Sequence, residues 1–232
     1  MARRVVTGTA VTDAGAADEP RSARREATRN RILDAARVVF AEKGVFGASI
    51  EDICEQAGFT RGAVYSNFTD KDDILRAVIE REHQALLDHI TDSFDMVDQE
   101  LSATPNLEAA VATLVDRIIR SNPSERRVPL ISTELEINAV RRPDIAAAFL
   151  IVNRRFRERL AAILAEALER IGRAPLVDPL DIIDAVMAIS ERSVRRAIIE
   201  GPHDDPDRLS AAILPRLLLA LSRPLEGAAS RP

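Results

Sequence analysis

Tryptophan is absent from this chain of 232 residues, and tyrosine and cysteine occur once each. Because aromatic residues make up only 3% of the chain, the core must be filled by Leu, Ile, Val and Ala, which favours packing between helices. The single cysteine, Cys54, excludes an internal disulfide and argues against a thiolate metal cluster. Its place beside Ile53 on a predicted helix indicates a small buried hydrophobic residue and not a sensor.

Long apolar runs are also missing. No stretch approaches the ~18 consecutive apolar residues that a membrane span requires, and the N-terminal sequence "MARRVVTGTAVTDAGAADEP" lacks the apolar block of a signal peptide. We therefore expect the chain to stay in the cytoplasm, with no membrane partner. Residues 1–20 are rich in Ala, Gly, Thr and Asp, and we expect them to form a disordered tail.

The net charge of −5 argues, taken alone, against a nucleic-acid partner, but the charge is unevenly distributed. Residues 1–71 hold 11 basic against 10 acidic residues, whereas residues 72–232 hold 21 against 27. The segment "RSARREATRNR" places five arginines against one glutamate. A basic end on an acidic body can bind a polyanion locally. The alternative is a solvated helix face that happens to be rich in arginine.

Local signals predict two helices between residues 26 and 58. Apolar residues recur at three- and four-residue steps from about Glu26 to Lys43, which predicts a helix with one buried stripe that ends at Gly44. A second helix follows Ser49, whose hydroxyl can cap it, and Asp52 stands three residues on, as in a capping box. Gly58 ends this helix.

A third and a fourth helix follow directly. Thr60 caps the third, which runs from about Arg61 to Asn67, and Asp70 introduces a longer fourth helix. Two short helices joined by a tight turn form a helix-turn-helix, whose second helix can enter the major groove of DNA. Arg61 can then form a two-pronged contact with guanine, and Gly62 permits a close approach of the backbone.

At these residues the chain resembles the TetR family of transcriptional regulators. The resemblance runs from about Ile32 to Leu75 and rests on "FAEKG", on "SIEDICEQAGFTRGAVYSNF" and on the lysine at position 71. It implies that Ser49 touches a phosphate, that the start of the third helix enters the groove, and that Tyr65 and Lys71 grip the DNA backbone. With the arginines of the basic segment, the residues predicted to bind double-stranded operator DNA are Arg25, Arg29, Ser49, Thr60, Arg61, Gly62, Tyr65, Asn67 and Lys71.

Two positions depart from the family pattern, and the residues above have structural alternatives. Asn67 stands where the family often has His, and Val64 replaces a commoner Leu or aromatic residue. Tyr65 can instead be a core residue with a solvated hydroxyl, and Arg61 and Lys71 can be ordinary surface charges.

Residues 72–222 read as helices separated by prolines, and no run suggests strands. The fold class is therefore all-α, with an N-terminal three-helix DNA-binding unit and a larger C-terminal helical bundle. We predict three regions: a tail (1–20), a helix-turn-helix domain (21–70), and a domain for ligand binding and dimerisation (71–223). We find no phosphate loop, nucleophile elbow, specific carboxylate pair or histidine cluster, so we expect neither an enzyme nor a metal or other cofactor.

The last two helices are apolar on more than one side, which indicates that they pack against a second partner as well as against their own domain. A two-fold bundle with the same helices of another subunit is the simplest such arrangement, and the TetR resemblance implies it independently. The alternative is that both helices lie at the centre of a monomer. Pro215 should bend or break the last helix. The predicted homodimer residues are Ile182, Ile183, Val186, Leu209, Ile213, Leu217 and Leu221.

These features predict a dimeric repressor of a near-palindromic operator, and the family resemblance implies release by a small-molecule effector. A transcriptional activator of the same fold is an alternative. So is an all-helical enzyme or carrier whose helix-turn-helix is an accident of packing. The shortage of aromatic residues suggests an aliphatic or modestly polar effector. Candidate ligand residues, for which core packing or surface exposure is the alternative, are Phe94, Met96, Leu130, Glu134, Asn138, Phe149, Asn153, Met187 and Ser190.

Overall fold

A computed structural model describes residues 19–94, 106–120, 127–201 and 207–225. Within these ranges the chain is almost entirely helical, which confirms the all-α prediction. The helices are α1 (Glu19–Lys43), α2 (Ile50–Ala57), α3 (Arg61–Tyr65), α4 (Lys71–Phe94), α6 (Leu107–Arg120), α7 (Arg127–Ala139), α8 (Pro143–Arg170), α9 (Pro179–Glu200) and α10 (Arg208–Ala220). Two short strands, β1 (Arg173–Pro175) and β2 (Ser222–Pro224), accompany them.

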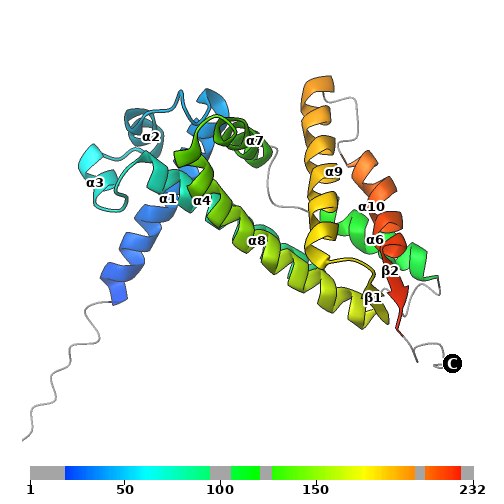
Figure 1. Cartoon of the computed structure of the whole chain (residues 1–232). Coiled ribbons are helices and arrows are strands. Elements are labelled where there is room, and N and C mark those ends of the chain that lie inside the picture. The colour runs from blue at the N-terminus through cyan, green and yellow to red at the C-terminus, as the bar shows by residue number, and fades with distance from the viewer. Residues whose placement is uncertain (1–18, 95–105, 121–126, 202–206, 226–232) are drawn as a thin grey trace, which may run out of the picture.

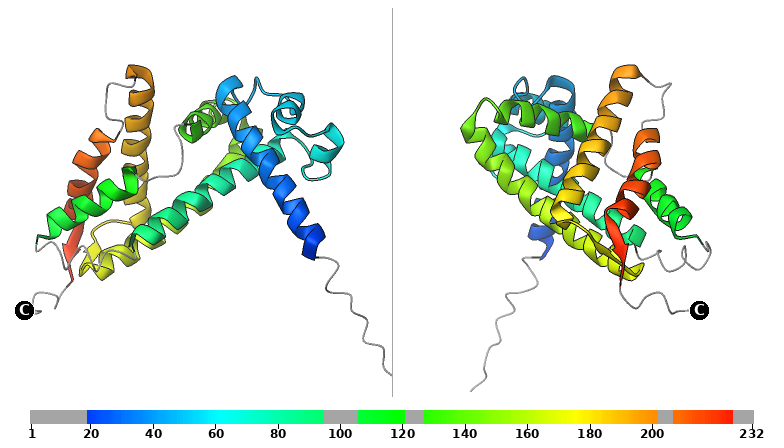
Figure 2. Two further views of the ribbon diagram at one scale, coloured as in Figure 1. Left: turned by 180° about the vertical axis from the view of Figure 1, so that it is seen from behind. Right: turned by 45° about the vertical axis from the view of Figure 1, so that its right-hand side comes forward.

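The helices form a small head and a larger body. The head consists of α1, α2 and α3 at one end of the molecule, and α6, α9 and α10 lie at the other end (Figure 1). The long helices α4 and α8 run side by side between the two ends, and α7 packs against both α1 and α8. The view from behind and the view turned by 45° show the same arrangement (Figure 2). The body therefore presents the head at the far end of two long helices.

The apolar stripes expected in the head form its core. Ile32 of α1, Ile53 of α2 and Val64 of α3 are completely buried in one hydrophobic cluster. The same cluster includes Ile74 of α4 and Ile131 of α7. The core of the head thus crosses the domain boundary that we predict at residue 70, and it ties the head to the body through apolar contacts.

Helix ends in the head largely follow the sequence signals. Ser49 and Asp52 form the expected capping box at α2, and Gly58 ends this helix in the left-handed conformation. Helix α1 begins at Glu19 and not near Glu26. The apolar periodicity did not reveal this earlier start, because the first two turns of the helix are polar. Helix α3 ends at Tyr65, two residues earlier than predicted.

The expectation that the chain contains no strands was wrong. Strands β1 and β2 pair in antiparallel fashion, with Arg173 opposite Pro224. The Arg173 Nε donates a hydrogen bond to Ser222 Oγ at 2.8 Å, and its Nη2 donates to the carbonyl of Leu219 at 2.9 Å. Three residues are too short for an alternating pattern to be visible in the sequence. The pair fastens the end of α8 to the end of α10.

Helix α10 continues through Pro215, so the expectation of a broken helix was wrong, and a bend at this residue stays a prediction. The proline lies inside the helix and is buried together with Leu214, and α10 packs against both α6 and α9. A proline removes one backbone hydrogen bond from a helix interior. Burial of the surrounding apolar residues therefore outweighs that loss.

Two of the residues predicted at a dimer interface were assigned wrongly. Ile182 is completely buried and Ile183 is 6% exposed, because α9 packs between α8 and α10 of its own chain. The apolar residues on these sides of α9 are thus covered within the protomer. Ile213 of α10 is 41% exposed. The other predicted positions are half-buried: Val186, Leu209, Leu217 and Leu221.

Candidate functional site

Helix α3 lies at the outer edge of the head with its N-terminal residues exposed (Figure 1). Thr60 Oγ1 accepts a hydrogen bond from the backbone N–H of Ala63 at 3.3 Å and so caps the helix, as predicted. Val64 faces the core, which turns the other side of the short helix outward. Thr60, Arg61 and Gly62 are exposed, and Tyr65 is 47% exposed. The structure thus presents these four predicted DNA contacts together on one surface.

Arg61 is held loosely within this surface. Its Nη1 lies 2.7 Å from Glu51 Oε1, and both side chains are largely exposed. The guanidinium carbon lies 5.9 Å from the centre of the Tyr65 ring. Because exposed ion pairs contribute little to stability, the pair with Glu51 can open at small cost and free the guanidinium for another partner.

The arginines of the basic segment brace the end of α3. Arg25 Nη2 donates to the carbonyl of Ser66 at 3.4 Å, and Arg29 Nη1 donates to the carbonyl of Asn67 at 3.2 Å. The Arg29 guanidinium also lies over the Phe68 ring, 4.3 Å from its centre. The Asn67 amide in turn donates to the Ala63 carbonyl at 2.9 Å. Arg25, Arg29 and Asn67 therefore meet where α3 ends, and DNA contacts by them stay predictions.

Two further predicted DNA contacts have internal partners. The Ser49 hydroxyl donates to Asp52 Oδ2 at 2.6 Å, and Lys43 Nζ lies 2.6 Å from Asp52 Oδ1. These bonds hold the pKa of the Asp52 carboxyl well below its usual value. Lys71 Nζ donates to the carbonyls of Val45 and Ala48 at 2.9 and 2.8 Å. Two of the three ammonium N–H groups of Lys71 are thus used to hold the turn between α1 and α2, and a phosphate contact by Ser49 or Lys71 stays a prediction.

The other side of this turn is held by Glu134 of α7. Its Oε2 accepts a hydrogen bond from the Val45 N–H at 2.8 Å, and its Oε1 accepts one from the Phe46 N–H at 3.3 Å. Gly44 has a φ of 76°, and a Cβ at this position would lie 3.0 Å from Glu134 Oε2. A larger residue at position 44 would therefore strain the backbone and crowd the carboxylate.

Glu134 was predicted to bind a ligand, and this assignment was wrong in position. Its carboxylate faces the head, whereas the cavity described below lies deeper in the body. The sequence signal was a polar residue on a mixed helix face, which does not reveal what the residue meets. We call this contact, from Glu134 to the backbone of Val45 and Phe46, the Glu134 bridge.

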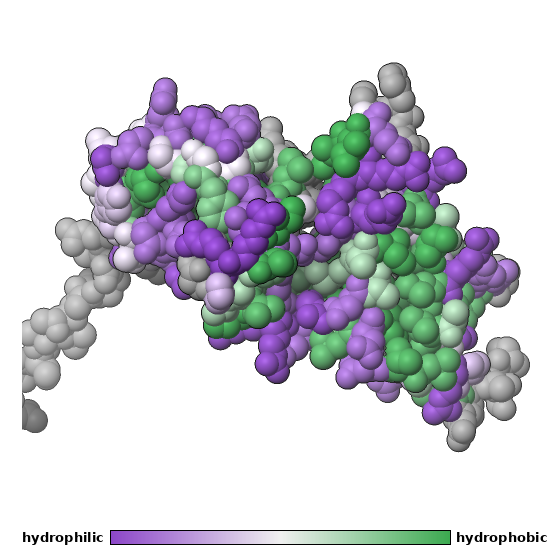
Figure 3. Space-filling model, turned by 45° about the horizontal axis from the view of Figure 1, so that its top comes forward, coloured by the Kyte–Doolittle hydropathy of each residue, from purple (hydrophilic) through white to green (hydrophobic). Residues whose placement is uncertain are grey.

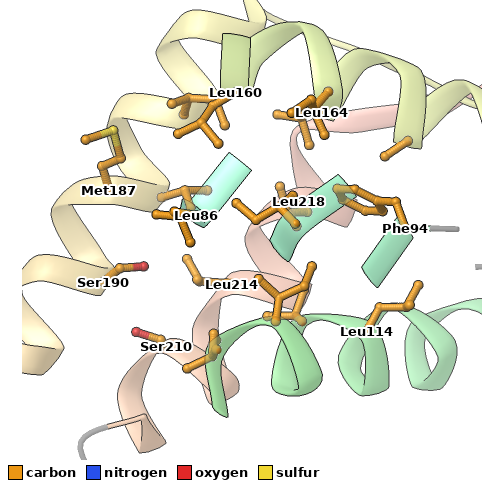
Figure 4. Close-up of a pocket in the computed structure, with 18 of the residues that line it drawn as sticks. Leu86, Phe94, Leu114, Leu160, Leu164, Met187, Ser190, Ser210, Leu214 and Leu218 are labelled. Carbon is orange, nitrogen blue, oxygen red and sulfur yellow. The ribbon is translucent and has the colours of Figure 1, made fainter. Parts of the chain in front are cut away.

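A cavity of about 540 Å³ opens between α4, α6, α8, α9 and α10. Its wall is built mainly from Leu, Ile and Val, and the side chains labelled in Figure 4 converge on it from these helices. Three predicted ligand residues, Phe94, Met187 and Ser190, line it. Five others do not: Leu130, Glu134, Asn138, Phe149 and Asn153. Met96 lies outside the described residues.

The misplaced residues have other contacts. Phe149 packs against the hydrophobic core of the head. Asn138 donates to the Glu134 carbonyl at 2.8 Å, and Leu130 is 40% exposed. Sequence reasoning also missed most of the cavity wall, because a leucine that faces a cavity and one that faces a filled core carry the same pattern.

His83 of α4 forms part of the cavity wall and stacks on Phe156 of α8, with 3.9 Å between ring centres. Burial lowers the pKa of His83 from 6.5 to about 4. The imidazole is therefore neutral at pH 7, and it adds no positive charge to the cavity.

Over residues 19–94, 106–120, 127–201 and 207–225, no group of three or more His, Cys, Asp or Glu side chains is placed to hold a metal ion. In the same ranges no helix has both the length and the apolar character of a membrane span.

We expect Glu134→Ala to free the two amides of the Glu134 bridge. Loss of a hydrogen bond to a charged acceptor should speed hydrogen exchange at Val45 and Phe46 by roughly tenfold or more. Exchange measured by NMR or mass spectrometry checks this, with Glu136→Ala on the same helix as the control. Unchanged exchange in Glu134→Ala would show that the bridge does not hold the turn.

We expect His83 to destabilise the fold as the pH falls. Its pKa is lower in the folded chain than in the unfolded chain, so the unfolded chain binds the proton first and stability declines from about pH 6.5 toward pH 4. Between pH 7 and pH 5 this residue should remove roughly 2 kcal/mol of unfolding free energy. Urea denaturation at both pH values should show a smaller decline for His83→Phe than for the original chain. An equal decline in both would assign the pH dependence to other groups.

Comparison with known proteins places the chain among bacterial regulators. Residues 32–78 match the family model described as bacterial regulatory proteins, tetR family.

The HTH-type transcriptional regulator SrpR of Pseudomonas putida is 39% identical over 98 residues, which span 42% of this chain and 42% of SrpR. The uncharacterized HTH-type transcriptional regulator TtgW of the same species is 38% identical over 98 residues, which span 42% of this chain and 67% of TtgW. The HTH-type transcriptional repressor BepR of Brucella suis is 32% identical over 137 residues, 53% of this chain and 63% of BepR. The chain thus spans less than half the length of SrpR and about two thirds of TtgW and BepR.

Solved structures share the whole architecture. A TetR-family transcriptional regulator from Mesorhizobium loti superposes with a TM-score of 0.64 at 22% identity, covering 86% of this chain and 98% of that one. The regulator FadR of Bacillus subtilis, solved with stearoyl-CoA, superposes with a TM-score of 0.57 at 18% identity, covering 81% and 96%. At these identities the structures show a shared fold. With the matched helix-turn-helix and the identity to TtgW, they show that the chain belongs to the TetR family of transcriptional regulators.

Proposed function

We propose that the protein is a dimeric DNA-binding repressor that a small molecule releases from its operator. The observation that carries this proposal is the exposed surface of Thr60, Arg61, Gly62 and Tyr65 on a capped helix at the edge of the head. Small residues at positions 62 and 63 let the backbone approach the bases, and Arg61 has only a weak partner to leave. We infer that the protein is a regulator and not an enzyme from these features and from its similarity to the transcriptional regulator SrpR and the transcriptional repressor BepR.

The N-terminal part of the chain, which includes the head, carries a charge that favours a polyanion, whereas the charge of the remainder does not. Residues 1–71 carry one more basic than acidic residue, and residues 72–232 carry six more acidic than basic residues. A body of negative charge turns away from DNA and so helps to orient the head toward it. The phosphate contacts of such a complex should make its affinity depend steeply on salt.

The proposed dimer forms through α9 and α10, at the end of the body far from the head. Such a dimer would let two heads bind the two half-sites of one operator. Figure 3 shows hydrophobic residues gathered at this end, and hydrophilic residues over much of the head. Ile213 of α10 is exposed, and so are the small residues Ala212 of α10 and Ala188 of α9. A patch of this kind, paired with itself about a two-fold axis, gives a closed interface. Two heads held in this way would reach half-sites about one DNA turn, ~34–36 Å, apart.

The cavity supports the effector part of the proposal. Its volume of about 540 Å³ lies within the usual range for small-molecule sites, and its wall is mostly apolar with a few polar groups. The wall includes residues of α9 and α10, which also form the proposed dimer interface. A ligand that prefers a different arrangement of these helices would change the separation of the two heads. The similarity to the transcriptional repressor BepR favours release from DNA over recruitment to DNA as the response to the ligand.

We expect Arg61→Ala to lower base discrimination at one or two positions of the operator. Loss of a two-pronged contact with guanine should reduce the preference there by roughly 5- to 150-fold. Selection from a randomised DNA pool, followed by titration of the selected duplex and its single-base variants, measures this preference. Arg154→Ala is the control, since Arg154 is an exposed residue of α8 in the body. Equal loss of affinity on every sequence would mean that Arg61 contacts phosphates and reads no base.

We expect Ile213→Glu to yield monomers. A charge at the centre of an apolar interface is costly when buried, whereas the substituted side chain stays exposed in the isolated protomer. Sedimentation should therefore show a monomer with an unchanged melting profile, and its affinity for the palindromic operator should fall. Ile137→Glu, an equally charged substitution on the exposed side of α7, should stay dimeric. An intact Ile213→Glu dimer would place the interface elsewhere.

A further inference from the structure

We propose that the cavity takes an uncharged, chain-like aliphatic molecule with one oxygen-bearing polar end, of which a primary alkanol is the simplest example. This inference rests on the proposed effector role of the cavity and names the chemical class that the wall accepts. Three properties of the wall favour such a ligand: its aliphatic surface, two hydroxyls at one end, and its charge.

The aliphatic surface fits a flexible chain. Leucines converge on the cavity from different helices, among them Leu86 of α4, Leu114 of α6 and Leu164 of α8 (Figure 4). Among the described lining residues, the phenyl rings are those of Phe94 and Phe156, and His83 already covers one face of the Phe156 ring. Planar aromatic ligands gain from free ring faces. A chain that can bend along branched side chains makes better use of this wall.

Two serine hydroxyls mark a polar end. Ser190 of α9 and Ser210 of α10 lie at the same end of the cavity, and both hydroxyls point into the space between the two helices (Figure 4). Ser210 is only 2% exposed. Helical serines often bond to the carbonyl four residues before, as Ser93 does here to His89. Among the described residues, Thr91, Ser93 and Ser222 make this bond, whereas Ser190 and Ser210 do not.

Ser190 is half-buried and Ser210 is buried, and a hydroxyl that borders a cavity without a protein partner is left to bond with water or a ligand. Each serine hydroxyl can both donate and accept a hydrogen bond. A ligand hydroxyl or carbonyl oxygen between Ser190 and Ser210 would therefore satisfy both. This places the polar end of the ligand between α9 and α10, and its chain toward Leu114 and Leu164 (Figure 4).

The charges of the wall disfavour an anion. The charged residues that line the cavity are Glu82, Arg120, Glu191 and Asp207. Carboxylates thus outnumber cations, and Arg120 lies 2.8 Å from Asp116 on its own helix. The neutral imidazole of His83 supplies no further positive charge. A fatty-acid carboxylate would therefore meet a described wall whose arginine already faces Asp116.

A cation is disfavoured for a different reason. Glu191 lies 3.5 Å from Arg195, and Glu82 lies 3.9 Å from Arg37, so both carboxylates already face arginines. Burial also raises the pKa of Glu191. Quaternary ammonium ligands are usually held by several aromatic faces, which the described wall does not offer. The ligand that meets all of these conditions carries no charge.

The test is calorimetric titration of the full-length protein with 1-hexanol, 1-octanol and 1-decanol, and with octanoate and octyltrimethylammonium as charged controls. Each methylene moved from water into the cavity should raise affinity about fourfold, so decanol should bind roughly 200-fold more tightly than hexanol. Octanol should bind at least tenfold more tightly than either charged octyl compound. The proposal is overturned if a charged compound binds as tightly as octanol, or if affinity does not rise with chain length.

Two variants locate the site. Ser210→Ala should weaken octanol binding roughly five- to tenfold and leave the fourfold increment per methylene unchanged, whereas Ser93→Ala, whose hydroxyl already bonds to His89, should change neither. Leu114→Trp should fill the cavity and abolish binding, with the exposed Leu176→Trp as its control. Because Leu114→Trp can also overpack the core, its melting profile is recorded, and Ser210→Ala decides alone if that variant is unfolded. Unchanged octanol affinity in Ser210→Ala contradicts the assigned polar end.

A parallel titration of octanol into the complex with selected operator DNA separates this inference from the proposed function. If octanol binds the free protein but leaves the DNA complex intact, the ligand class stands and release by this ligand fails. If octanol does not bind while a charged or aromatic compound releases DNA, the proposed function stands and the ligand class is wrong.

Discussion

The Glu134 bridge is the contact on which the relation of head to body depends. Apolar packing joins α1 and α7 without fixing their direction, whereas two hydrogen bonds from one carboxylate to adjacent N–H groups do fix it. The turn that they hold leads directly into the cap of α2, and α2 supports α3. Lys71 holds the carbonyls of the same turn from α4. Two charged side chains of the body therefore hold the turn before α2, and through α2 they help to position α3.

Three consecutive residues of α7 connect the cavity with the head. Ser132 lines the cavity, Thr133 accepts a hydrogen bond from Arg195 of α9 at 3.3 Å, and Glu134 forms the bridge. A change in the position of α9 can thus reach the turn before α2 through one turn of one helix. This is a physical route between the proposed effector site and the proposed DNA surface, and it passes beside Ile131 and Leu135 of the same helix, which lie in the hydrophobic core of the head.

The helix ends of the head could be predicted from the sequence, whereas the contacts and the cavity inside the body could not. The caps at Ser49 and Thr60 and the left-handed Gly58 are local, since the groups that bond are three or four residues apart. The role of Glu134 depends on residues almost ninety positions away, and the burial of Ile183 depends on which helices flank α9. A polar residue on a helix, or an apolar one on its second side, shows only that some partner exists. The family resemblance supplied the expectation of a dimer and a ligand, but the structure was needed to place the cavity.

The pairing of β1 with β2 limits how the helices can move when a ligand occupies the cavity. It pins the last turn of α10 to the end of α8, so α10 can pivot about that point but cannot slide along its neighbour. A ligand that pushes α8 and α10 apart would therefore change the angle between these two helices. Helix α8, with 28 residues, is about 40 Å long. A tilt of only about 5° at the pinned end would move the opposite end, beside the head, by about 3.5 Å, given the length of such a helix.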